Sequence, residues 1–136
     1  MTSSRTWTRP GRSRRGDRGA AVVDFVLVGA LATLVFVGVL QLAVVLHVRN
    51  TLIDCASEGA RYGALADRGP ADGARRAAGL IGQDLSPRYA RDVTGGIEDV
   101  GGLPTVVVQV RAPLPVLGLL GAGVVTVVGH ALREPP

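Results

Sequence analysis

An uncharged run of 22 residues, positions 25–46, constrains the fold of this chain more than any other feature. At about 1.5 Å per residue, a helix of this length extends about 33 Å, close to the roughly 30 Å hydrocarbon core of a bilayer. The run exceeds the apolar region of a secretory signal peptide, which has about 7–15 residues. The bulky stretch VVLHVRN that follows offers no small-residue cleavage site. The sequence therefore predicts a membrane-spanning helix that is retained as an anchor.

The basic residues of the chain are distributed unevenly around this run. Six of the 15 arginines precede it, and with Asp17 they give residues 1–19 a formal charge of +5, whereas residues 20–136 carry nine arginines and ten acids. The positive-inside rule then places the N-terminus in the cytoplasm and the rest of the chain outside. Because the basic charge does not continue beyond the run, the composition argues against nucleic-acid binding. The pair Arg14–Arg15 is not followed by the apolar residues of a twin-arginine signal.

The helix is expected to leave the membrane and continue over residues 47–67. Small residues recur there at spacings of three and four, which predicts a narrow face for close helix packing. This predicted face consists of Leu52, Cys55, Ala56, Gly59, Tyr62, Gly63 and Ala66. Glycine and proline in residues 67–73 break the helix, and a second short helix is predicted over residues 71–85.

Short β-type runs follow. Strands are predicted over residues 93–100, 103–112 and 124–132, with Gly95-Gly96 interrupting the first strand and Gly101-Gly102 forming a turn. Residues 113–123 are predicted to form an apolar loop containing proline and glycine. A second membrane span over residues 114–128 is disfavoured, because the uncharged run has only 15 residues and contains three glycines.

The predicted fold class is α+β. A long N-terminal transmembrane helix continues into a small extracytoplasmic domain that has a short second helix and a small antiparallel sheet. The expected organisation is a basic cytoplasmic leader at residues 1–19, the membrane helix at 20–48 and the outer domain at 49–136.

Motifs for catalysis or metal binding do not emerge from the sequence. His47 and His130 belong to no metal-ligand pattern, the glycine-rich GLLGAG lacks the features of a phosphate loop, and no serine lies in a GxSxG context. We therefore expect no enzyme activity, no metal, no cofactor and no small-molecule substrate. Cys55 is the only cysteine, which excludes an internal disulfide. Its expected role is a small apolar filler, with an intermolecular bridge or lipidation as alternatives.

Three features then occur in order along the chain. A basic leader ends at Gly19 with Asp24 five positions later, the apolar run follows, and RNTLIDCASEGARYGAL (residues 49–65) comes next. In this order the chain resembles the TadE-like proteins, minor pilins (pseudopilins) of tight-adherence (Tad/Flp) pilus assembly. The stretch Glu58, Gly59, Ala60, Arg61 and Tyr62 is similar to the REGARYA segment of that family. The C-terminal VVVQVRAPLPVLGLLGAGVVTVVGHALRE also resembles the ending of the family.

The resemblance implies a pilin-like subunit or assembly factor in the inner membrane, with the cell surface as a further location. A prepilin peptidase would cleave after Gly19 and leave Ala20 as the new N-terminus. The implied partners are this peptidase, other pilin or pseudopilin subunits, the pilus secretion machinery and the membrane. Entry into the fibre and priming of its assembly both remain open, as do a TadE-type and a TadF-type role.

Asp24 has two interpretations. In the first, its carboxylate pairs with the ammonium that cleavage exposes at Ala20 of a neighbouring subunit, since intramembrane charges are normally paired. A helix beginning at Ala20 would also favour an anion in its first turn by roughly 0.3–1 kcal/mol. In the second, Asp24 is an interfacial residue that stays among the lipid headgroups. The family usually has Glu at this position, and Asp shortens the reach by one methylene.

A different class of function is an alternative. The chain would then be a single-pass, membrane-anchored binding module of the cell envelope, and its arginine-rich leader would remain uncleaved on anionic lipid. The two hypotheses differ in whether Gly19 is needed for processing.

Overall fold

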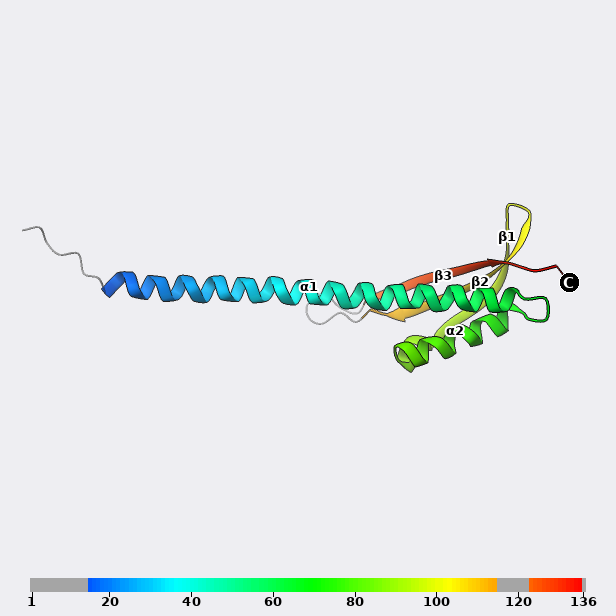
Figure 1. The fold of residues 1–136 in the computed structure, drawn as a ribbon, viewed down its shortest axis with the longest axis horizontal. Helices are drawn as coiled ribbons and strands as arrows, with labels where there is room; N and C mark the ends of the chain where they lie inside the picture. Colours follow the sequence, from blue (N-terminus) through cyan, green and yellow to red (C-terminus); the bar gives the residue numbers. More distant parts are fainter. Residues whose placement is uncertain (1–14, 115–122, 136) are drawn as a thin grey trace, which may run out of the picture. The chain divides into compact units, whose positions relative to one another are not determined.

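The computed structural model of the chain describes residues 15–114 and 123–135, in which one long helix leads into a small α+β unit (Figure 1). Two compact units are separated after residue 38, Met1–Gly38 and Val39–Pro136. Helix α1 spans Arg15–Ala64 and has 50 residues. It begins five residues before Ala20, because residues 15–24 contain no proline and their two glycines, Gly16 and Gly19, do not stop a helix. It ends three residues before the predicted residue 67.

The apolar part of α1 is exposed along its length. Large apolar side chains from Val22 to Leu40 are all more than half exposed, with Phe25 at 79%. Within the described residues, α1 is the one helix long and apolar enough to cross a membrane, and its most apolar window contains no buried residue. A helix that is apolar all round and uncovered by its own chain is suited to lipid, as expected for the predicted membrane anchor.

The second unit contains a short helix and a three-stranded sheet. Helix α2 spans Pro70–Asp84, and a 3₁₀ turn, η1, spans Pro87–Ala90. Strands β1 (Asp92–Val100), β2 (Leu103–Pro113) and β3 (Val124–Leu132) form an antiparallel sheet in the order β1-β2-β3. The α+β fold class predicted from the sequence is confirmed.

One face of the sheet packs against both helices. Gly95 of β1 and Gly129 of β3 both lie opposite Val108 of β2, so the three residues share this face. A Cβ atom added to Gly129 would meet the backbone of Ala56 in α1, and one added to Gly95 would meet the backbone of Pro70 in α2. The core lies between these layers and consists mainly of small and β-branched residues: Leu52, Cys55, Ala56, Ala60, Ala77, Ile81, Val108, Val110, Ala112 and Val127.

The β1–β2 hairpin closes as predicted at Gly101-Gly102. Both glycines have positive φ, +65° and +85°, as the type I′ hairpin turn requires, and glycine adopts such values without steric cost. The side chain of Asp99 accepts a hydrogen bond of 2.7 Å from the Gly102 N–H and stabilises the turn.

The first strand differs from the expectation. The predicted interruption at Gly95-Gly96 is wrong, since β1 is continuous from Asp92 to Val100. Gly95 instead gives the first turn of α2 room to contact the sheet. Helix α2 is shifted by one residue at each end relative to the predicted 71–85. The predicted apolar loop falls largely at residues 115–122, outside the described part of the chain.

Candidate functional site

The residues of the predicted cleavage site lie inside α1. Gly19, Ala20 and Asp24 are helical and exposed, and a Cβ atom at Gly19 would meet no other atom within 4 Å. None of the ion pairs between described side chains involves Asp24. The carboxylate therefore lies on an exposed helix surface, next to a long apolar stretch and available to a partner.

Helix α1 begins earlier than expected, and this changes the position of Asp24 within the helix. In the uncleaved chain the helix begins at Arg15, so Asp24 is its tenth residue and not a first-turn residue. The helix macrodipole acts mainly within the first turn and contributes little at that distance. Asp24 gains that contribution only if the chain is cut after Gly19.

The motif at Glu58–Tyr62 is a packing element. Gly59 and Ala60 are buried, whereas Arg61 is exposed. Glu58 and Arg61 form an ion pair of 3.7 Å on the helix surface, a type that contributes little to stability. The buried members of the motif face the second helix and the core, and the motif belongs to a different unit from Asp24. The two groups of predicted site residues therefore do not form one site.

Close contact between glycine backbones joins α1 to α2. A Cβ atom added to Gly59 would lie 2.6 Å from the carbonyl oxygen of Gly73 and 2.7 Å from the Cβ of Ala77. One added to Gly63 would lie 2.9 Å from the carbonyl oxygen of Gly69. Real Cβ atoms essentially never come nearer than 3.0 Å, so a side chain at Gly59 or Gly63 would push the helices apart. Gly73 was missed by the sequence reasoning, although the spacing of four in Gly59/Gly63 and again in Gly69/Gly73 is a signal for such packing.

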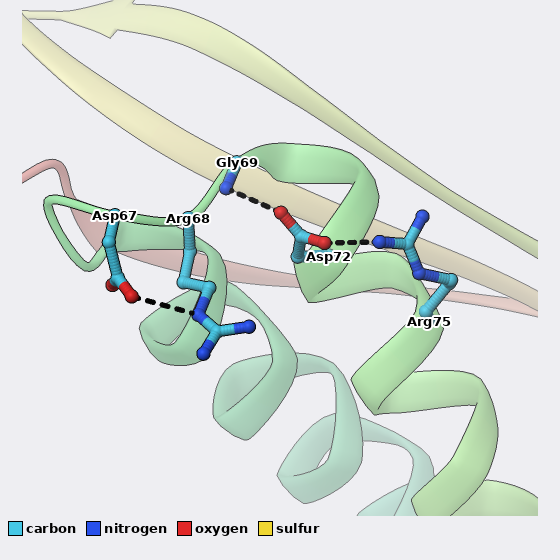
Figure 2. A network of polar contacts seen from close by, with 5 residues as sticks. All are labelled: Asp67, Arg68, Gly69, Asp72 and Arg75. Atoms are coloured by element: carbon cyan, nitrogen blue, oxygen red, sulfur yellow. Dashed lines mark hydrogen bonds and ion pairs between the residues drawn. The ribbon is translucent and has the colours of Figure 1, made fainter.

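Polar contacts fix the turn between the two helices (Figure 2). The Gly69 N–H donates a hydrogen bond of 3.0 Å to the Asp72 carboxylate, which also pairs with Arg75. This side chain closes the first turn of α2, where Pro70 occupies the first helical position. Arg68 pairs with Asp67 at 3.3 Å and places its guanidinium 5.0 Å from the ring centre of Tyr62. The tyrosine of the motif therefore contacts the turn.

The predicted small face of α1 is correct at five of its seven positions. Leu52, Cys55, Ala56, Gly59 and Gly63 are buried, whereas Tyr62 is half-buried and Ala66 lies beyond the end of α1 and is exposed. Ala60 and Ala64 are buried in addition. The buried surface is wider than one stripe because α1 packs against α2 on one side and against β3 on another.

Cys55 is buried against α2. Its thiol donates a weak hydrogen bond of 3.9 Å to a carboxylate oxygen of Asp84. Burial of the thiol, followed by the negative charges of Asp84 and Asp54, raises the pKa of Cys55 from an ordinary 9.0 to about 11. Such a thiol is a poor nucleophile at neutral pH, in keeping with a packing role. No group of three or more His, Cys, Asp or Glu suited to a metal occurs in residues 15–114 and 123–135.

A comparison with known protein families finds a match for one part of the chain. Residues 19–61 match the TadE-like protein family. The match begins at Gly19 and ends at Arg61, so it includes the apolar run and most of the Glu58–Tyr62 motif, and it confirms the resemblance stated from the sequence. It lies entirely within α1, and the resemblance of the C-terminal residues to the family stays a prediction. No curated protein and no solved structure matches the chain.

The glycine contact predicts opposite effects for two similar substitutions. Gly59→Ala should lower the free energy of unfolding of the second unit by about 1–3 kcal/mol, because its methyl group meets Gly73 and Ala77. Gly79→Ala, in α2 with nothing within 4 Å, should raise it by about 0.5–1 kcal/mol through helix propensity. Urea-dependent exposure of the Cys55 thiol in detergent measures both. Equal effects at the two positions would contradict the close contact.

The raised pKa of Cys55 predicts slow alkylation in the folded protein. At pH 8 the thiolate fraction is about a hundredfold below that of an ordinary thiol, so iodoacetamide should react at least about a hundredfold more slowly than with the urea-unfolded chain. The pKa of Cys55 is higher in the folded than in the unfolded chain, so the thiol adds to the free energy of unfolding. This contribution is fully present below pH 9 and is lost as the pH rises through about 11. Equal alkylation rates in the folded and unfolded chain would exclude a buried thiol.

Proposed function

We propose that this chain is a minor pilin or pseudopilin of a tight-adherence (Tad/Flp) pilus, either a structural subunit or a factor that primes assembly. The observation that carries the proposal is the TadE-like match over residues 19–61, which starts at the glycine of the predicted cleavage site. The TadE-like family consists of structural pilus components and is not an enzyme family.

The exposed apolar surface of α1 supports membrane insertion before assembly and helix packing after it. The chain itself covers none of the apolar window, so lipid or other subunits must do so. In the proposed topology the basic N-terminus lies in the cytoplasm and the second unit outside the inner membrane, as the excess of arginine before the span favours.

Processing by a prepilin peptidase after Gly19 completes this proposal. The Gly19–Ala20 bond lies in a helix that starts at Arg15, so its backbone groups are engaged in helical hydrogen bonds. The peptidase would therefore have to open the first turns of α1 to reach the bond. A glycine at this point favours such opening, because glycine is less favourable in a helix interior than alanine by about 1 kcal/mol.

Cleavage would change the surroundings of Asp24 in two ways. The helix would begin at Ala20, which brings Asp24 within reach of the macrodipole, and each subunit would present a new ammonium group. A carboxylate exposed on the apolar helix of one subunit could then pair with the ammonium of the next as the helices pack. The charge pair would set the axial register of the subunits.

Processing is tested by mass spectrometry of the protein extracted from membranes of cells that carry the peptidase. The expected mature chain begins at Ala20, and Gly19→Leu should yield the full-length chain only, because a bulky residue blocks the cut. An intact N-terminus in the unmodified protein, or a cut elsewhere, would favour the uncleaved envelope binding module.

The role of Asp24 is tested by comparing three variants. Asp24→Ala should insert into the membrane normally but abolish most of the co-purification with other pilin subunits. Asp24→Glu should retain it, since Glu keeps the charge and is the residue usual in the family. Asp54→Ala removes an exposed acid of α1 beyond the apolar run and serves as the matched control. Normal assembly of Asp24→Ala would remove the carboxylate from the mechanism.

A further inference from the structure

Strand β3 runs alongside α1 in the same direction. Gly129 packs against the backbone of Ala56 near the middle of the strand. Beyond the strand's end, the Glu134 N–H donates a hydrogen bond of 2.9 Å to the carbonyl of Ala64, at the end of the helix. The beginning of β3 must therefore point back toward the residues of α1 that precede Ala56, and Figure 1 shows the strand directed in this way.

The level that β3 reaches on α1 follows from the geometry of the two elements. Val124 lies five residues before Gly129, and at about 3.3 Å per residue in a strand this is about 16 Å. The same length in a helix is about eleven residues, so Val124 lies level with about Val45 of α1. In agreement, Val48 and Ala112 belong to one buried cluster, and Val125, the strand partner of Ala112, packs against it. The uncharged run ends at Leu46, so this end of the sheet lies where the membrane would end.

At this end of the sheet the last two pairs of the β2–β3 ladder, Pro113–Val124 and Ala112–Val125, are apolar. Val124 is 68% exposed, and Val44 and Leu46 of α1 are 42% and 46% exposed. The Leu114 N–H donates a hydrogen bond of 2.8 Å to the Gly123 carbonyl, so the chain leaves and re-enters the sheet here. Charged residues begin at the next pair, where Arg111 of β2 lies opposite Asp92 of β1. The opposite end of the sheet carries Glu98 and Asp99 on β1 and Arg133 and Glu134 after β3.

We propose that this apolar end of the sheet, defined by Leu114 and Val124, rests on the lipid surface in which α1 is anchored. The second unit would then contact the bilayer at the β2–β3 end as well as through α1. The occupant is lipid because the end lies level with the close of the membrane span and continues its apolar surface. Two attachments orient the unit, whereas α1 alone would leave it free to rotate about the helix axis.

This inference rests on the proposed function only in taking α1 as a membrane anchor. The test uses the full-length protein in phosphatidylcholine vesicles, with a fluorophore on single cysteines in a Cys55→Ala background. Val124→Cys is compared with Leu132→Cys, because the two residues lie at opposite ends of β3 and are similarly exposed, 68% and 62%. Val35→Cys, in the middle of the apolar run, reports whether α1 is inserted. Unchanged thermal unfolding of the labelled proteins verifies their fold.

Lipids that carry a spin label near the headgroup should quench the Val124 label at least several-fold more strongly than the Leu132 label. Deep spin labels should quench the Val35 label. Equal, weak quenching at both ends of β3 with an inserted Val35 label would overturn the inference and leave the membrane anchor intact. A Val124 label that is shielded from water but not quenched by lipid would also overturn it, in favour of a second copy of the chain. An unquenched Val35 label would overturn the anchor itself, and the inference with it.

Discussion

The second unit depends on the close approach of α1 and α2 at Gly59, Gly63 and Gly73. A Cβ atom at Gly59 would lie 2.6 Å from the Gly73 carbonyl oxygen, so only glycine permits this separation. Because α2 lies so close to α1, one face of a three-stranded sheet can cover both helices with small and β-branched residues. The core needs no large aromatic cluster, and the conspicuous motif at Glu58–Tyr62 serves first to hold the helices together.

The apolar helix and the packed unit have opposite relations to solvent. The large apolar side chains of the uncharged run are mostly exposed, whereas from Val48 onward one side of the helix is buried by the rest of the chain. One helix therefore carries both an anchor and one side of a core.

Much of this architecture could be predicted from the sequence. The long uncharged run, the Gly101-Gly102 turn and the last strand follow from local patterns, because hydrophobic periodicity and positive φ are properties of short segments. The continuity of β1 through Gly95-Gly96 could not be predicted in this way. Glycine in a strand indicates an interruption or a close backbone approach, and only the position of α2 against Gly95 distinguishes the two.

For the candidate site, the sequence by itself determined the membrane helix, the carboxylate at Asp24 and the order of leader, span and Glu58–Tyr62 motif, since each depends on residue type and spacing along one helix. The tertiary structure alone decided that Gly59 faces Gly73, that Gly129 faces Ala56, and that β3 begins level with the end of the apolar run. These facts depend on contacts between segments far apart in the chain. A local sequence pattern predicts which face of a segment is buried, but not which other segment packs against that face.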